Sequence, residues 1–171
     1  DKGEDVGRMC EGPGQFYDAT TPKAREYVWE KCRTHYAELG VDAFWLDEAE
    51  PEYGTYDFDN YRYYAGPNQQ VANIYPRDYN KGFYEGQQTI GRDGDIVNLT
   101  RCAWAGSQRY GSLVWSGDVS STFADLRAQI TCAIHMGMAG IPWCTTDMGG
   151  FHDGMIDSDD FKELLARWCA F

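Results

Sequence analysis

The sequence predicts an α/β fold in which helices alternate with the strands of a parallel sheet. Short apolar runs of strand length alternate with longer stretches whose apolar residues recur at helical spacing. Four apolar runs end in a charged residue, and these residues are Asp47, Arg101, Asp118 and Asp147. The carboxyl ends of parallel strands share one edge, where α/β proteins bind ligands. A (β/α)8 TIM barrel has eight strands and about 250 residues, so the four strands of this 171-residue chain predict part of such a barrel.

The first predicted unit is a helix followed directly by a strand, after an irregular segment at residues 1–20. Thr21 is the expected N-cap, with Pro22 at the first helical position. Gly40 is expected to close the helix, and the strand 41–47 follows. The apolar positions at helical spacing are Ala24, Val28, Cys32, Tyr36 and Leu39.

The middle of the chain predicts a long loop, a helix and a second strand. Residues 48–72 are polar and rich in tyrosine, and a loop of this length is either functional or a small subdomain. A helix is expected at about 75–89, with Tyr79, Phe83 and Tyr84 as apolar positions. The strand 96–101 contains the glycosylation sequon Asn98-Leu-Thr100, which we expect to be buried and unused.

The last third predicts two more strands, 112–118 and 140–147, each followed by a helix. The helix 122–138 begins at Thr122, with Asp125 at capping-box spacing. Its expected buried positions are Leu126, Ile130, Ala133 and Ile134. Gly149 and Gly150 mark a turn after the last strand. Ser158 is expected to cap a final helix with one apolar face, formed by Phe161, Leu164, Leu165 and Trp168.

Composition argues against several classes of partner. The net charge is -12 and no basic stripe is present, so neither nucleic acid nor an anionic membrane is the expected partner. No apolar run approaches the roughly 20 residues of a membrane span. Six scattered cysteines without a C-x-x-C pair indicate neither a metal site nor a small disulfide scaffold, and three histidines are too few to favour a histidine-based site. No signal peptide is visible, so we expect a cytoplasmic protein, although the first residue is Asp1 and a periplasmic or secreted location stays open.

The charged strand ends favour an active site over structural salt bridges. Two carboxylates that face one cleft suit glycoside hydrolysis, because one attacks the anomeric carbon while the other protonates the leaving oxygen. Trp45, Trp104 and Trp115 could stack on a sugar ring. The rival interpretation is Mg²⁺ or Ca²⁺ binding by the acids, and Arg101 in the same group counts against it.

Three segments resemble the signatures of glycoside hydrolase family 31. Phe44-Trp-Leu-Asp47-Glu-Ala-Glu50 is similar to the family's nucleophile motif, aromatic-Trp-x-Asp-Met-Asn-Glu. Thr100–Gly111 and Trp115-Ser-Gly-Asp118 resemble its arginine-containing strand and its acid/base strand. Trp143-Cys-Thr-Thr-Asp147-Met-Gly-Gly-Phe151 resembles its Asp-Ile-Gly-Gly-Phe segment. The resemblance implies that residues 1–171 are a partial catalytic barrel, about strands four to seven, with N-terminal and C-terminal parts missing.

The resemblance also implies a role for each matching residue. Asp47 would be the nucleophile and Asp118 the general acid/base of a retaining double displacement, for which no cofactor is needed. The residues implied to bind substrate are Arg101, Asp147, Trp45, Trp115, Phe151 and Glu50. Core packing is the alternative for Trp45 and Trp115. The family's Met after the nucleophile is Glu48 here, which either faces solvent or alters substrate choice.

The resemblance leaves the substrate open between two sugars. The details of the motifs favour an α-xylosidase that releases α-linked xylose from xylo-oligosaccharides or xyloglucan fragments, with an α-glucosidase on α-gluco-oligosaccharides as the alternative. The expected partner is therefore an oligosaccharide, and whether the full-length protein is a homo-oligomer stays open. Two alternatives of another class are a non-catalytic carbohydrate-binding relative and an inactive truncated fragment.

Overall fold

The computed structural model describes residues 17–50 and 61–171, which fall into two compact units, one ending at Ser112 and the other beginning at Leu113. The first unit contains α1 (Pro22–His35), η1 (Ala37–Leu39), β1 (Trp45–Leu46), β2 (Arg62–Tyr63), β3 (Gly66–Pro67), α2 (Asn68–Val71), η2 (Ala72–Ile74), α3 (Tyr75–Thr89), β4 (Asn98–Thr100) and η3 (Ser107–Tyr110). The second contains β5 (Ser112–Trp115) from Leu113 onward, α4 (Phe123–Met138), β6 (Cys144–Thr145) and α5 (Asp159–Cys169). Across the described residues, no helix is both long and apolar enough to cross a membrane.

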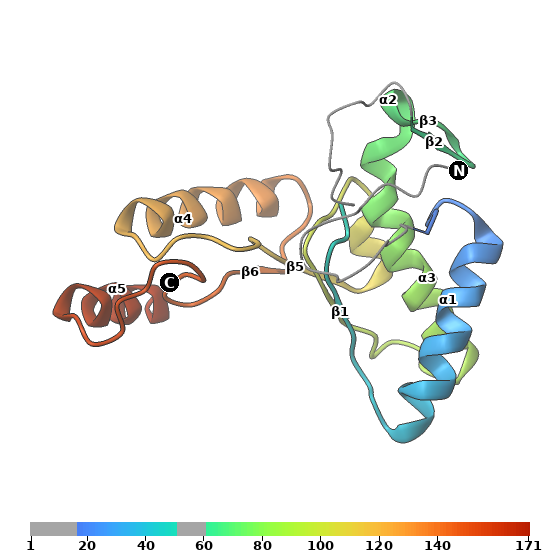
Figure 1. Cartoon of the computed structure of the whole chain (residues 1–171), viewed down its shortest axis with the longest axis horizontal. Coiled ribbons are helices and arrows are strands. Elements are labelled where there is room, and N and C mark those ends of the chain that lie inside the picture. The colour runs from blue at the N-terminus through green and yellow to red at the C-terminus, as the bar shows by residue number, and fades with distance from the viewer. Residues whose placement is uncertain (1–16, 51–60) are drawn as a thin grey trace, which may run out of the picture. The chain divides into compact units, whose positions relative to one another are not determined.

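The core of the first unit lies between two helices and a parallel strand pair. Helices α1 and α3 run side by side (Figure 1), and β1 pairs with β4 in parallel register. Trp29, Leu46 and Phe83 are buried together, and the ring of Trp29 meets those of Phe44 and Phe83 edge to face. Such pairs of aromatic rings add to the stabilisation that their buried area provides.

The predicted apolar face of α1 is confirmed as far as Cys32 and differs beyond it. Val28 and Cys32 pack against the core, and Trp29, which was not among the predicted apolar positions, is the buried residue of the helix. Its large side chain removes the most apolar area from water. Tyr36 and Leu39 lie beyond the end of α1 and are 55% and 80% exposed. Thr21 occupies the N-cap position but does not cap the helix with its side chain. Its hydroxyl instead donates to Asp18 Oδ2 at 2.9 Å.

The strands are shorter than predicted, and part of the expected loop is structured. The ladder between β1 and β4 pairs two residues of each strand, Trp45 with Leu99 and Leu46 with Thr100. Residues 41–44 are therefore outside the regular strand, although the carbonyl of Phe44 still accepts a hydrogen bond from the amide of Leu99 at 3.0 Å. Within the expected loop, residues 51–60 lie outside the described part of the chain. The remainder forms the antiparallel hairpin β2–β3 and the short helix α2.

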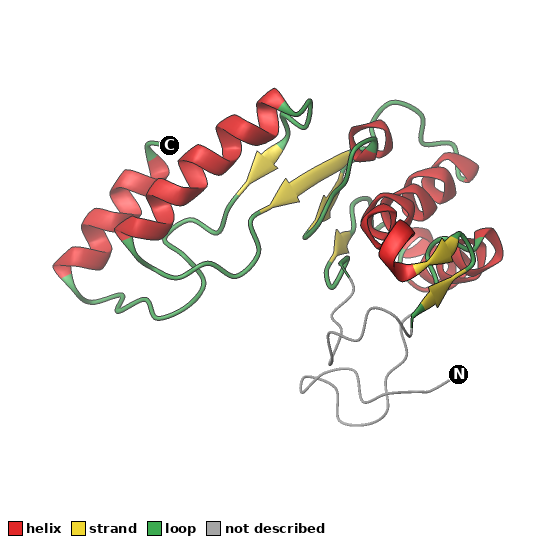
Figure 2. Cartoon of the chain, turned by 90° about the horizontal axis from the view of Figure 1, so that it is seen from above, coloured by secondary structure: helices red, strands yellow, loops and turns green. Residues whose placement is uncertain are grey.

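The second unit is a parallel strand pair, β5 with β6, and two helices. Figure 2 shows α4 and α5 side by side, and Leu126 of α4 is buried against Leu164 and Trp168 of α5. The alternation of helices with parallel strands confirms the predicted α/β class.

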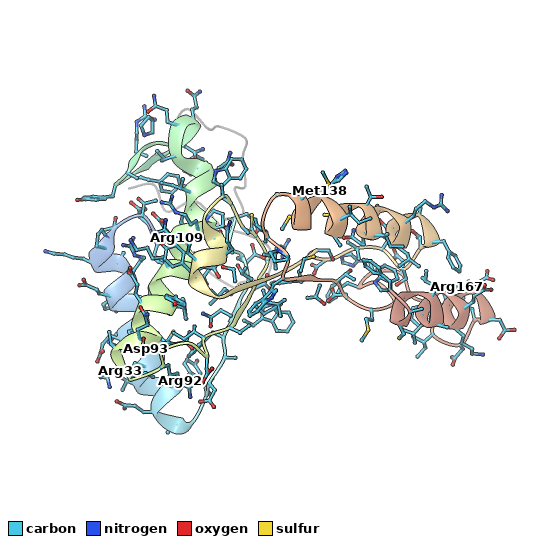
Figure 3. The ribbon with its side chains drawn as sticks, turned by 180° about the vertical axis from the view of Figure 1, so that it is seen from behind. Arg33, Arg92, Asp93, Arg109, Met138 and Arg167 are labelled. Carbon is cyan, nitrogen blue, oxygen red and sulfur yellow. The ribbon has the colours of Figure 1, made fainter. Side chains whose placement is uncertain are left out.

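The capping of α4 follows the sequence prediction, but its buried face is narrower. The amide of Asp125 donates to Thr122 Oγ1 at 3.0 Å, as predicted. Ile130 and Ile134 were expected in the core and are 36% and 58% exposed, because α5 covers only the stripe around Leu126. Ala133 is half-buried, Leu165 is 36% exposed, and Met138 at the end of α4 is 82% exposed (Figure 3).

Candidate active site

The register of β1 and β4 brings Asp47 and Arg101 together. Leu46 pairs with Thr100, so the residue after each strand stands next to its counterpart. The amide of Arg101 donates to the carbonyl of Leu46 at 3.2 Å, which extends the ladder to the strand ends. The sequence prediction that these two charged residues share one sheet edge is therefore confirmed.

Three carboxylates contact the guanidinium of Arg101. Its Nη1 donates to Asp47 Oδ1 at 3.4 Å and to Glu48 Oε1 at 3.3 Å. Its Nε lies 2.8 Å from Glu50 Oε1. Partial burial acts to lower the pKa of Arg101, but the charges of Glu50, Glu48 and Asp47 outweigh it, so the pKa lies above its usual value.

A tight turn after β1 turns these carboxylates toward the arginine. Glu48 has φ of 50°, a left-handed conformation that non-glycine residues rarely adopt. Its amide donates to Asp47 Oδ1 at 2.9 Å, and the next residue, Ala49, is fully buried. The side chain of Glu48 is only 39% exposed because it reaches back to Arg101. It is therefore part of the site rather than a solvent-facing residue.

Buried side-chain amides of α3 donate hydrogen bonds to side chains of β4, a feature that the sequence interpretation missed. Asn80 donates to Thr100 Oγ1 at 3.0 Å, and Gln87 donates to Asn98 Oδ1 at 3.0 Å. Asn98 Oδ1 also accepts from the amide of Phe44 at 3.3 Å. Asn98 and Thr100 have no exposed surface, as the sequence predicted for the sequon. The missed signal is spacing, because Asn80 and Gln87 share a helix face with Phe83.

In the second unit, β5 and β6 place Asp118 and Asp147 near one another. Trp115 pairs with Thr145, and the amide of Ser116 donates to the carbonyl of Thr145 at 3.2 Å. Burial, and after it the negative charge of Asp118, raises the pKa of Asp147. Asp118 itself is exposed.

The backbone after β6 requires glycine at two consecutive positions of the segment that follows Asp147. Gly149 and Gly150 have φ of 92° and 85°, which other residues rarely adopt. A Cβ on Gly150 would also lie 2.7 Å from backbone atoms of Ser121. The turn returns the chain to Val119, whose carbonyl accepts from the amide of Phe151 at 2.7 Å. This contact ties the loop after β6 to the loop that carries Asp118.

The aromatic residues proposed to line a sugar site differ in exposure. Trp45 and Phe151 are 66% and 61% exposed, so both present a ring surface, and Trp104 is 47% exposed. Trp115 is 4% exposed, which favours the alternative of core packing for this residue.

The guanidinium of Arg101 contacts all three carboxylates that follow β1. Within residues 17–50 and 61–171, no group of three or more His, Cys, Asp or Glu side chains has an arrangement suited to a metal ion. Asp47 lies beside a fixed positive charge in the first unit, and Asp118 lies near a second carboxyl group in the second.

Three relatives illustrate what the chain resembles. An uncharacterized family 31 glucosidase of Pseudescherichia vulneris is 55% identical over 168 residues, which cover 98% of this chain and 32% of that protein. An α-xylosidase of Saccharolobus solfataricus is 39% identical over 154 residues, or 85% of this chain and 20% of that protein. The crystal structure of a family 31 α-xylosidase from a soil metagenome, complexed with xylose, is 57% identical and has a TM-score of 0.92, covering 98% of this chain and 25% of that one.

The chain thus spans about a third or less of the length of these relatives. All of its residues, 1–171, match the sequence family described as the glycosyl hydrolases family 31 TIM-barrel domain. This match confirms the predicted barrel fold and the predicted family. The chain belongs to the TIM-barrel domain of glycoside hydrolase family 31.

Proposed function

We propose that the full-length protein hydrolyses α-glycosides with retention, by double displacement, and that it releases α-linked xylose from xylo-oligosaccharides or xyloglucan fragments. Asp47 is the nucleophile and Asp118 is the general acid/base. Arg101 and Asp147 bind hydroxyl groups of the sugar, and Trp45 and Phe151 border it.

Each residue of the pair acts twice in this reaction. Asp47 attacks the anomeric carbon and forms a glycosyl ester, while Asp118 gives its proton to the leaving oxygen. In the second step Asp118 takes a proton from water, the water oxygen bonds to the anomeric carbon, and the carboxylate of Asp47 leaves. The sugar is released with its original anomeric configuration, and one water is consumed.

The observation that carries this proposal is the placement of Asp47. It follows directly on strand β1 and is exposed, with Arg101 Nη1 at 3.4 Å from its Oδ1. The preference for xylose is supported by the α-xylosidases among the relatives, including that of S. solfataricus and that from a soil metagenome. The P. vulneris relative is called a glucosidase, and it supports α-glucosidase activity as the second candidate.

The catalytic roles are tested in the full-length protein with Asp47→Ala and Asp118→Ala. Each variant is expected to lose several orders of magnitude in kcat, as removal of a catalytic carboxylate does. Azide should restore glycosyl transfer in Asp118→Ala when the substrate has an activated leaving group, because azide needs no general base. Asp42→Asn, which alters a surface ion pair with Arg92, serves as the control. Near-normal activity of either alanine variant would contradict the assignment.

The substrate is tested by comparing kcat/KM for paired aryl α-xyloside and aryl α-glucoside. A preference of tenfold or more, about 1.4 kcal/mol in transition-state binding, identifies the sugar. A tenfold preference for glucoside would replace xylosidase by glucosidase activity. If neither sugar is cleaved, the xylose and glucose proposals both fail and another α-glycoside must be the substrate, with Glu48 the first residue to test.

A further inference from the structure

The guanidinium of Arg101 has five N–H donors, and the carboxylates around it contact Nε and Nη1. Glu50 Oε1 lies 2.8 Å from Nε, while Asp47 and Glu48 accept from Nη1 at 3.4 and 3.3 Å. Among the residues that the structure describes, none accepts a hydrogen bond from Nη2. Within the described part of the chain, the Nη2 donors are therefore the ones available to a ligand.

Glu50 makes the dominant contact in this group. Its distance to the guanidinium is the shortest of the three, and its side chain is 31% exposed, compared with 53% for Asp47 and 39% for Glu48. A guanidinium is a rigid planar fork, so an ion that fixes the Nε edge also fixes the directions of both Nη groups. The Nη1 contacts are hydrogen bonds at 3.3 and 3.4 Å, whereas Nε and Glu50 form an ion pair at 2.8 Å, the closest approach of a carboxylate to the guanidinium.

The backbone holds Glu50 in place for this role. Ala49 is fully buried directly before it, and the left-handed conformation of Glu48 turns the chain back toward β4. The buried Ala49 and the left-handed Glu48 thus restrain the backbone that carries the carboxylate of Glu50. A carboxylate anchored in this way loses little conformational freedom when it pairs with the arginine.

We propose that Glu50 is a positioning residue that sets the plane of the Arg101 guanidinium and directs Nη2 toward the substrate. This inference rests on the proposed function, in which Arg101 binds a sugar hydroxyl, and it replaces direct substrate binding as the role of Glu50. Without Glu50, Arg101 rotates toward Asp47 and Glu48, and the Nη2 donors lose their direction.

A double-mutant cycle in the full-length enzyme separates positioning from direct binding. Glu50→Leu is expected to lower kcat/KM on the order of 10²-fold, the scale of a misplaced binding group. In an Arg101→Met background, the same change should alter kcat/KM by no more than about twofold, the usual scatter of such cycles. If Glu50 instead contacts the sugar itself, its loss will multiply with the loss of Arg101, and positioning is overturned.

Two further variants control for folding and for charge. Glu50→Gln keeps an oxygen that can accept from Nε, so it should retain more kcat/KM than Glu50→Leu; equal losses would contradict positioning. Asp42→Asn alters an exposed ion pair in the same unit, with Arg92 (Figure 3), and should leave kcat/KM unchanged. Circular dichroism of each variant checks its fold.

A structural readout needs no turnover. In a crystal structure of full-length Glu50→Leu, the guanidinium of Arg101 is expected to be rotated, with Nη1 nearer to Asp47 than 3.4 Å. An unchanged guanidinium would overturn the inference even if activity falls. Conversely, if the wild-type enzyme cleaves no α-glycoside but the guanidinium rotates, the proposed function fails while the positioning of Arg101 by Glu50 stands.

Discussion

Gly86 of α3 leaves space that Trp29 of α1 fills, and a single methyl group at this position tests the core of the first unit. A Cβ on Gly86 would lie 2.2 Å from Trp29 Cδ2 and 2.3 Å from Cγ. Non-bonded carbon atoms normally approach to about 3.5–4.0 Å. The indole cannot withdraw easily, because it is 6% exposed and its ring packs against Phe44 and Phe83 at 5.8 and 6.2 Å.

The expected cost of Gly86→Ala is the difference between two opposing effects. Alanine favours a helix over glycine by about 1 kcal/mol. Overpacking a well-filled core costs about 1–3 kcal/mol, and the upper value applies here because the clash falls on a rigid, enclosed ring. The net destabilisation is therefore about 2 kcal/mol.

Gly137 in α4 provides a matched control, because a Cβ added to it would meet no atom within 4 Å. Gly137→Ala should stabilise by about 1 kcal/mol, so the two alanine variants should differ by about 3 kcal/mol. Urea unfolding of the 171-residue chain, followed by circular dichroism, measures both. In a Trp29→Leu background, Gly86→Ala should lose its penalty. A Gly86→Ala variant as stable as Gly137→Ala would refute the packing argument.

Three further predictions concern the second unit. Thr122→Ala removes the acceptor for the amide of Asp125 and should lower the free energy of unfolding by about 1 kcal/mol in urea titrations. The pKa of Asp147 is raised, so between the ordinary carboxyl pKa and the raised one the folded chain holds a proton that the unfolded chain has lost. The free energy of unfolding should therefore fall as the pH rises through this window. Asp118→Asn should lower the pKa of Asp147 in carboxyl NMR titrations without fully normalising it, because burial is the larger cause; an unchanged value would contradict the charge effect. Gly150→Ala should destabilise by more than about 1 kcal/mol, because of its positive φ and its contact with the backbone of Ser121; a neutral result in thermal unfolding would count against that geometry.

The sequence predicted the features that depend on local chemistry. Charged residues at strand ends, the cap at Thr122 and the glycine pair after Asp147 all follow from rules that act over a few residues. The pairing of Asp47 with Arg101 also followed, because the ends of parallel strands share an edge.

What the sequence could not predict depends on which surfaces meet. Helix α1 contains an apolar stripe through Val28, and Trp29, one residue away, packs in the same cluster, because the opposing surface of α3 decides how wide the buried face is. Ile134 fits an apolar face by spacing but is 58% exposed, because burial requires a neighbour and not only a pattern. The contact between Glu50 and Arg101 depends on the backbone conformation of Glu48, which no propensity rule assigns to glutamate.

The buried amide of Asn98 has a consequence for how the protein is produced. Its Oδ1 accepts from both Gln87 and the amide of Phe44, and no part of the residue reaches solvent. The sequon Asn98-Leu-Thr100 is therefore closed to an oligosaccharyltransferase once β4 has formed. In a eukaryotic secretory host, a glycan attached to the nascent chain would prevent this strand from pairing with β1. Expression in a bacterial cytoplasm avoids that competition, and an Asn98-glycosylated product from a secretory host should be recovered only as misfolded material.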